Sequence, residues 1–392
     1  MSNNRFPTLP EPEIIRPDFD SALASLKERY NAETGHYPTL NDPETAHLEQ
    51  IAYEKNEVID AINYESKQNL PAFASGARLE HLAALVGAGE RLDESRASTV
   101  IQLNFSAPHA AAVVPQGWQV MAVDNKTIFE CMQEYIVKPT DTVVLANFEC
   151  TTKGVGGNGF IAGQISTIVS DDIIGLQSVE NITTSQGGAP AEDDDAYAYR
   201  IWLAPSSWSA CGPYDAYEFF ALSASSAIGS VSIWNPAPNE VYISAILLDG
   251  TLPEQPIKDA ILAQCSGEKR VPMGDLPSVV DVTETAGSAT IALSIYKDYA
   301  SLGSNILDTA IEKVETELLV WKTTHGHDIV VQTLEALCKS IEGVYYAEVH
   351  VLDNFGNEIN EIKSISKTER ANISLVSSIY QIVDEYSTTN FQ

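Results

Sequence analysis

The sequence of 392 residues lacks the features that mark membrane-spanning and nucleic-acid-binding proteins. No apolar run approaches the roughly 20 residues that span a bilayer. Lys and Arg number 23 against 54 Asp and Glu, a formal net charge of −31. Such a charge repels phosphate backbones and anionic lipids, so we expect no nucleic-acid partner and no membrane insertion. It favours basic protein partners, or else serves solubility alone.

Cysteine is scarce, and its spacing excludes the common cysteine motifs. No two of the five cysteines are close enough for a zinc knuckle or a Cys-x-x-Cys redox pair, and their number is odd. We expect reduced, buried thiols in a protein made in the cytosol. The first residues contain no apolar segment, so we also expect no signal peptide. The cysteines are Cys131, Cys150, Cys211, Cys265 and Cys338.

The sequence has none of the familiar catalytic signatures. It contains no Gly-x-Ser-x-Gly elbow, no His-Glu-x-x-His pair and no Walker loop. We therefore predict no catalytic residue, no cofactor and no metal site, and hence no enzyme. The alternative is a hydrolase that acts on cell wall or surface polysaccharide through a pair of carboxylates. No pair stands out among the abundant acids, and a site assembled only in three dimensions stays open.

One glycine-rich stretch matches a nucleotide-binding pattern. Gly154-Val-Gly-Gly-Asn-Gly159 fits Gly-x-Gly-x-x-Gly, which cradles a pyrophosphate when a helix follows it. The residues that follow are β-like and are interrupted by Gly163. A glycine turn between two strands is therefore the favoured interpretation.

Two polar clusters could hold metal ions. Glu192-Asp-Asp-Asp195 offers carboxylates that suit Ca²⁺, but it lacks the spacing of an EF-hand loop. It lies where a helix should begin, and acids are stabilising in a first turn, so we favour a helix cap and leave cation binding open. His325-Gly-His327 has no Cys or third His nearby, so we favour a polar turn over a zinc site.

Residues 1–95 have the pattern of a helical unit. After a proline-rich arm, Asp18 or Asp20 can cap a first helix. A second helix, from about residue 44 to 69, places Leu48, Ile51, Val58 and Ile62 along one stripe. A third, residues 75–86, ends at two glycines.

The pattern changes to strands at residues 96–185. Thr99, Ile101, Leu103 and Phe105 alternate with polar residues, as on a half-buried strand, and turn signals recur at short intervals. This region predicts an all-β domain.

Helices and strands alternate in the rest of the chain, and we divide it into α+β domains at residues 186–300 and 301–392. A long helix from Asn305 to Trp321 carries an apolar stripe that includes Leu318. The segment Tyr345–Leu352 alternates like a half-buried strand. The predicted fold class is multidomain α+β: an N-terminal helical unit, a central all-β domain, and C-terminal α+β domains with small antiparallel sheets.

Several motifs, in their order along the chain, resemble the baseplate J family. These are Leu48–Tyr53 and the Gly76–Arg91 segment, Pro115-Gln-Gly117, Gly156-Gly-Asn-Gly159, and the stretch from Gly187 to Ile201 with its Gly-Gly, acidic run and Arg-Ile. The resemblance runs from about residue 15 to 376. Glu80 stands where Asp is usual, and Tyr197-Ala-Tyr199 replaces a more charged stretch. Subfamily and host therefore stay open.

The resemblance implies a structural role in the baseplate of a contractile phage tail or related injection particle. The expected protein is a wedge subunit, assembled in the host bacterial cytoplasm, that links wedges into a ring around the hub and transmits the change that triggers sheath contraction. Expected partners are other copies of the chain (two per wedge, six wedges), other wedge proteins and, indirectly, the hub, spike and sheath. Phage, tailocin and other injection systems stay open. The residues expected at protein interfaces are Leu48, Ile51, Val58, Ile62, Leu79, Leu82, Arg91, Leu318 and Trp321.

Overall fold

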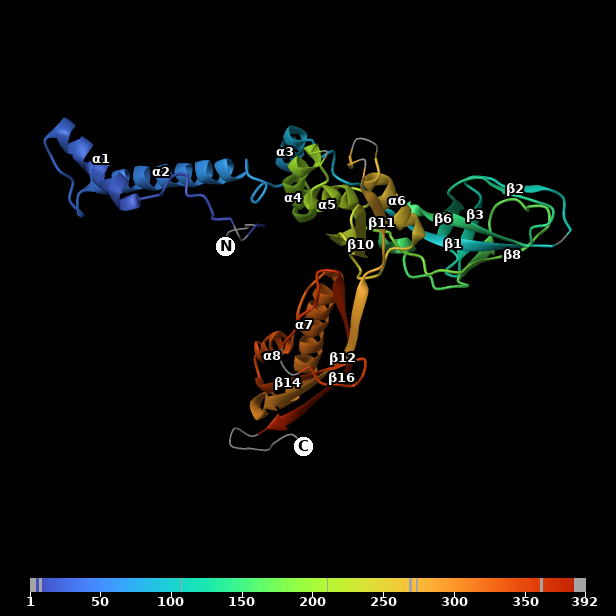
Figure 1. Cartoon of the computed structure of the whole chain (residues 1–392). Helices are drawn as coiled ribbons and strands as arrows, with labels where there is room; N and C mark the ends of the chain where they lie inside the picture. The colour runs from blue at the N-terminus through green and yellow to red at the C-terminus, as the bar shows by residue number, and fades with distance from the viewer. Residues whose placement is uncertain are drawn as a thin grey trace. The chain divides into compact units, whose positions relative to one another are not determined.

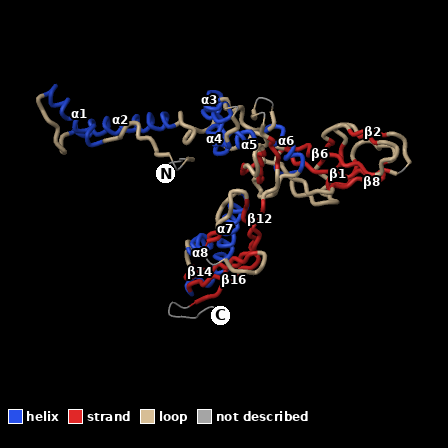
Figure 2. Tube along the Cα trace, in the orientation of Figure 1, coloured by secondary structure: helices blue, strands red, loops and turns tan. Residues whose placement is uncertain are grey.

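The computed structural model describes residues 5–6, 9–106, 108–209, 211–267, 270–272, 274–359 and 362–383. The chain forms two compact units, one of residues 1–91 with 193–205, the other of residues 92–192 with 206–392. Helices make up the regular structure of the first unit, whereas strands dominate residues 92–192 (Figure 2). Along the described part of the chain, no helix combines the length and apolar character that crossing a membrane requires.

The first unit begins with a helical hairpin of α1 (Phe19–Thr34) and α2 (Pro43–Lys67) (Figure 1). Asp18 caps α1 as predicted, because its side chain accepts a hydrogen bond from the Ser21 amide at 2.9 Å. Pro43 opens α2, where its missing N–H is not needed.

Two shorter helices complete this unit. α3 (Ala77–Val86) ends at Gly87, and α4 (Asp194–Leu203) packs against it. Asp193 caps α4 by accepting from the amides of Asp195 and Ala196. The interpretation of the acidic run as a first-turn cap is therefore confirmed. The chain continues through a short 3₁₀ segment, Ala204–Trp208.

The second unit opens with an antiparallel sheet in the order β7-β3-β4-β6-β1-β8. Its outer strands β7 and β8 also approach each other, which makes the sheet nearly a barrel. Alternate side chains such as Ile101, Phe129 and Phe148 fill its interior and are fully buried. The strands, with the separate β2–β5 pair, are β1 (Arg96–Phe105), β2 (Ala112–Val114), β3 (Gln119–Ala122), β4 (Ile128–Cys131), β5 (Tyr135–Val137), β6 (Val143–Lys153), β7 (Ile165–Ile168) and β8 (Leu176–Asn181).

A small mixed sheet follows, which we call the middle module (residues 214–279). β10 pairs with β9 in antiparallel fashion and with β11 in parallel, because α6 carries the chain back between β10 and β11. The elements are α5 (Tyr214–Leu222), β9 (Ile228–Trp234), β10 (Glu240–Leu247), α6 (Gln255–Cys265) and β11 (Leu276–Val279).

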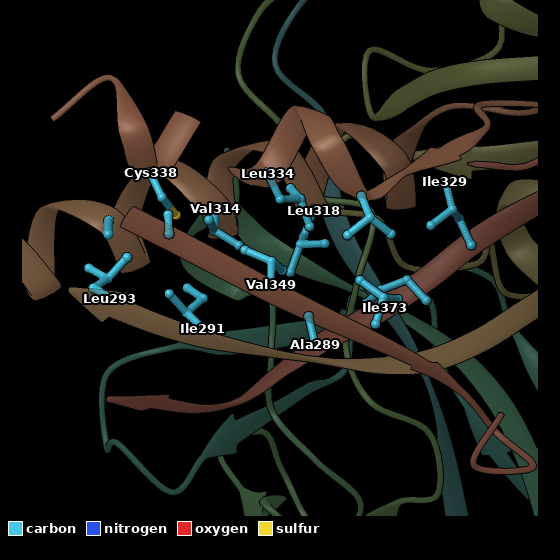
Figure 3. Close-up of a cluster of buried hydrophobic side chains, with 14 of the residues drawn as sticks. Ala289, Ile291, Leu293, Val314, Leu318, Ile329, Leu334, Cys338, Val349 and Ile373 are labelled. Carbon is cyan, nitrogen blue, oxygen red and sulfur yellow. The ribbon is translucent and has the colours of Figure 1, made fainter. Parts of the chain in front are cut away.

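The C-terminal module (residues 283–383) is a second mixed sheet covered by two helices. β12 lies between β14, its antiparallel neighbour, and β16, its parallel neighbour. Side chains of α7 and α8, including Val314, Leu318 and Leu334, lie against the strands in one core (Figure 3). The elements are β12 (Thr283–Tyr296), the 3₁₀ segment Lys297–Leu302, α7 (Gly303–Thr323), β13 (Ile329–Val330), α8 (Val331–Lys339), β14 (Val344–Asp353), β15 (Ile362–Lys363) and β16 (Glu369–Val383).

The α+β class is confirmed, and the structure adds detail to it. Each of the two three-stranded sheets contains one parallel pair, which the prediction of antiparallel sheets omitted. β12 precedes the boundary that we place at residue 300, yet it pairs with β14 and β16, which follow that boundary. Pairings between strands so far apart depend on the tertiary structure, and local periodicity does not report them.

Candidate protein-interaction site on the N-terminal helices

An apolar groove of about 630 Å³ runs between the second half of α2 and α3. Its apolar lining includes Val58, Ile62, Leu82 and Leu85. Val58 is 59% exposed and Leu85 is 78% exposed, values typical of surface residues rather than of a core. Because exposed apolar side chains line a concave surface, this groove is a candidate protein-interaction site.

Two faces of α2 carry different contacts, and this division leaves the groove open. One face packs inside the unit: Ala52 is fully buried, and Asn63 bonds the N-terminal arm. Its amide pairs with the Ile15 backbone, accepting from the N–H at 2.9 Å and donating to the C=O at 2.7 Å. Ile62, one residue earlier, points about 100° away around the helix and stays 43% exposed.

The link between α2 and α3 is held by polar contacts. Gln68 is buried, donates to the Phe73 carbonyl at 2.9 Å and accepts from the Ser75 amide at 3.1 Å. Arg5 of the arm donates to the Ala74 carbonyl at 2.6 Å. These bonds fix the direction in which the chain enters α3, and with it one wall of the groove.

Charges lie at the edge of the groove. Arg78 of α3 donates to the Glu65 carboxylate of α2 at 2.6 Å, and its guanidinium lies 6.0 Å from the centre of the Tyr64 ring. Glu65 and Arg78 both line the groove. An apolar floor with a charged edge suits an amphipathic helix.

Beside the groove, α3 is joined to α4 by a cluster of charged and aromatic side chains. Arg200 is buried and donates to the carbonyls of Ala88 at 2.6 Å and Glu90 at 2.7 Å. The Tyr197 ring lies near two guanidiniums, 5.0 Å from Arg200 and 4.7 Å from Arg91. The Gly76–Arg91 segment and the stretch that ends at Ile201, separated by about a hundred residues, therefore meet here.

Asp194 adds an ionic contact to this cluster. It accepts from Arg91 at 2.8 Å and from the Gly76 amide at 3.0 Å, while Arg91 also reaches Glu80 at 3.0 Å. Burial raises the pKa of Asp194, but the hydrogen bonds from Gly76 and Arg91 outweigh it and hold the pKa below its ordinary value. A charged Asp194 therefore serves the start of both α3 and α4.

The residues predicted at protein interfaces fall into two groups. Ile51, Val58 and Ile62 are exposed, Leu82 and Arg91 are half-buried, and three of these five line the groove. The other four are buried in the chain itself: Leu48 in α2, Leu79 in α3, and Leu318 and Trp321 in the C-terminal core. These four are core residues, because their side chains have almost no surface left for a neighbour.

The polar motifs also have defined places. The stretch Gly154–Gly159 contains a short 3₁₀ turn (Val155–Gly157) between β6 and β7, and no helix follows it, as the turn interpretation predicts. Among the described residues, no group of three or more His, Cys, Asp or Glu side chains is arranged to hold a metal ion.

His325 occupies a position that its motif did not indicate. It is not a ligand in a His pair but a buried side chain, bonded to Ser230 of β9 and Ser244 of β10 at 2.8 and 2.9 Å. No local pattern brings these serines to His325, because they lie more than eighty residues earlier in the chain.

Comparison with known protein families gives two matches, one at residues 41–93 and one at residues 102–188. Residues 41–93, which include α2, α3 and Arg91, match the baseplate J-like N-terminal domain. Residues 102–188, which make up most of the barrel-like sheet, match the baseplate J-like protein barrel domain. No curated protein matches the sequence.

Among solved structures, the chain is similar to one in the cryo-EM structure of the anti-feeding prophage (AFP) baseplate, 6-fold symmetrised. That match covers 90% of this chain and 90% of the other, at 9% sequence identity and a TM-score of 0.38. Because both values are low, the assignment rests on the two family matches. Residues 41–93 and 102–188 of this chain therefore match the N-terminal and barrel domains of baseplate J-like proteins.

Proposed function

We propose that this protein is a wedge subunit of a contractile tail baseplate, with a structural role and no catalysis. The observation that supports it most is the small buried core of the α1–α2 hairpin, together with the open groove between α2 and α3. Only Ala22 in α1 and Thr45, Leu48 and Ala52 in α2 are buried. Helices with so little core depend on tertiary contacts for their stability, and a bundle with neighbouring chains would supply them.

In this proposal, two copies per wedge and another wedge protein form a helical bundle through the groove. Val58, Ile62 and Leu82 would be the contacts on this chain, with Glu65 and Arg78 setting the orientation of the incoming helix. Charged residues at the edge of a helical interface choose the partner and its direction more than they add affinity.

We further propose that C-terminal parts of neighbouring copies, roughly residues 200–380, meet and close the ring around the hub. Leu318 and Trp321 cannot make this contact, because they are core residues. Exposed apolar side chains on β16, such as Val376 and Ile379, are available for it. Separate cores for the barrel-like sheet and the C-terminal module would let such parts move as bodies during sheath contraction.

The location follows from the same proposal. The protein would be assembled in the bacterial cytoplasm and reside in the tail baseplate of a phage or related particle, where hub, spike and sheath are indirect partners. The tail-hydrolase alternative would require a pair of carboxylates facing each other in a cleft, one of them with a raised pKa, and we do not adopt it.

The test places two charges in the groove of the full chain, Val58→Asp with Ile62→Asp. We expect normal folding by circular dichroism but failure to enter assembled baseplates, because two carboxylates would be buried in an apolar interface. The matched control is Val123→Asp with Ile136→Asp, two exposed positions on the β-rich part, which should assemble normally.

Particles that incorporate the groove variant as efficiently as the control would contradict the bundle. A reconstruction of the intact baseplate tests the remainder. Six or twelve copies around the axis with touching C-terminal parts would support the wedge role, and a single copy or isolated copies at fibre tips would refute it.

A further inference from the structure

A set of hydrogen bonds, which we call the polar joint, connects the middle module to the C-terminal module. At its centre lies His325, just after α7. The His325 imidazole contacts β9 and β10 of the middle module. Nδ1 lies 2.8 Å from Ser230 Oγ, and Nε2 lies 2.9 Å from Ser244 Oγ. Ser244 is fully buried. Both nitrogens of a neutral imidazole are thus satisfied, one donating and one accepting.

Two further bonds complete the polar joint. Ser232 of β9 donates to the Lys367 carbonyl at 2.7 Å. Arg370, at the start of β16, is buried and donates to the Gly250 carbonyl in the turn after β10 at 2.7 Å. Gly250 has φ +74°, and a Cβ there would lie 3.0 Å from the Lys322 side chain, so only glycine allows this close approach.

The hydrogen bonds of the polar joint lie outside the large apolar core of the C-terminal module. That core consists of residues between Ala289 and Ile373 and includes none from β9, β10 or β11. The covalent link between the modules is short, residues 280–282. The polar joint therefore contributes directly to holding the two modules in one orientation.

We propose that the polar joint is a proton-sensitive latch: a neutral His325 holds the middle and C-terminal modules together, and a protonated His325 lets them separate. This goes beyond the proposed function, since it requires neither a ring nor a partner chain.

The charges around the polar joint determine the direction of the effect. Arg370 of β16 is the nearest cation, and it is itself paired with Glu284 of β12 at 2.9 Å. β9 and β10 face the imidazole with the neutral hydroxyls of Ser230 and Ser244. No carboxylate bonds the imidazole to stabilise its charged form.

The direction of the pH effect follows from the linkage between protonation of His325 and opening of the joint. Burial, and then Arg370, lower the pKa of His325 from 6.5 to about 4 in the closed joint. A solvated imidazole in the open joint regains its ordinary pKa and binds a proton at higher pH. The closed joint therefore keeps its full stability above about pH 6.5 and loses it as the pH falls toward 4. Between pH 7 and pH 5 the ratio of open to closed should rise about 20-fold.

The experiment measures the distance between the modules in the full chain by pulsed electron spin resonance. One nitroxide label is placed on the exposed Cys211, and a second on Glu315→Cys, an exposed position on α7. We expect one narrow distance distribution at pH 7.5 and a reversible second population at pH 5. His325→Gln keeps a neutral hydrogen-bonding side chain and should remove the pH response. His350→Gln, at an exposed histidine of the same module, should leave that response intact.

Ser244→Ala with Ser230→Ala provides a test that does not depend on a change at residue 325. Loss of both hydroxyls should produce the second population already at pH 7.5. The latch is refuted if the wild-type distribution is the same at pH 7.5 and pH 5. It is equally refuted if His325→Gln responds to acid as the wild type does, since other groups would then open the joint.

Discussion

The α1–α2 hairpin and the C-terminal module use similar helices in opposite ways. One of the 16 residues of α1 and three of the 25 residues of α2 are buried, whereas α7 buries six of 21. α7 packs one side, including Val314, Leu318 and Trp321, into the core of its own module. α2 leaves Ile51, Val58 and Ile62 exposed.

This difference shows that an apolar stripe alone does not reveal what covers it. The C-terminal module closes its own core and behaves as a folded body. The hairpin lacks such a core, so its stability must come from the helix links, its capping groups and, in our proposal, neighbouring chains. Single substitutions in the two regions test this contrast, and the buried core of α7 should be the most sensitive.

Trp321→Ala should have the largest effect. The Trp321 side chain is fully buried, and its indole N–H donates to Glu317 at 2.9 Å. Its removal leaves a large cavity, which should lower the free energy of unfolding of the C-terminal module by about 3–5 kcal/mol. Chemical denaturation monitored by hydrogen exchange measures this. Leu319→Ala, at a half-exposed position of the same helix, is the control and should cost much less. Equal effects would show that α7 is not closed by its own core.

Native thiol reactivity should separate the closed parts from the surface. Burial raises the pKa of Cys131 and Cys338 to about 11 and that of Cys265 to about 12. At pH 8 a thiol with pKa 11 has a thiolate fraction about 100-fold below one with pKa 9, and its burial slows reaction further.

We therefore expect one rapidly reacting thiol in the native chain, Cys211, which is exposed. Five should react after unfolding. In Trp321→Ala, Cys338 should gain reactivity because it shares that core, whereas Cys131 in the barrel-like sheet should not. A second fast thiol in the wild-type protein would contradict the closed cores.

Two neighbouring glycines allow a matched test of packing in the barrel-like sheet. A Cβ on Gly157 would lie 2.8 Å from Ala97 Cβ and Cys150 Cβ, whereas a Cβ on Gly156 would meet nothing within 4 Å. Gly157→Ala should therefore destabilise by about 1–3 kcal/mol through overpacking. Gly156→Ala should be close to neutral. Thermal unfolding of both variants measures the difference, and equal melting temperatures would show that the glycine turn is not packed against the sheet.

Ile62→Ser should have the smallest effect on the isolated chain. Ile62 is exposed in the groove, so its replacement should change the free energy of unfolding by no more than about 0.5 kcal/mol. Denaturant titration measures this value. A loss of several kcal/mol would mean that the groove is already filled within the chain, and the contrast with α7 would no longer hold.

Much of the fold follows from local pattern. The caps at Asp18 and Asp193, the helix from residue 77 to 86 and the alternation in β1 and β14 were all predictable, because helix capping and side-chain periodicity depend on neighbours a few residues apart. The motifs of the resemblance were visible for the same reason. The two family matches, at residues 41–93 and 102–188, confirm the resemblance to the family but reach only the start of the stretch from Gly187 to Ile201.

The groove was predictable only in part. The stripe with Val58 and Ile62 was visible in the sequence, but Leu48, Leu79, Leu318 and Trp321 have the same apolar character and are buried. Apolar residues at helical spacing show that a face is covered, without showing whether the chain itself or a partner covers it.

The sequence by itself determined the order of helices and strands, the glycine turn and the acidic character, because each depends on residue type and short spacing. The packing of whole modules selects which apolar stripe stays open, pairs β12 with both β14 and β16, and brings His325 and Arg370 to β9 and the turn after β10. These strand pairings and hydrogen bonds join residues about 50 to 120 positions apart. Their partners are chosen by the packing of whole modules, and no local pattern of residues encodes that packing.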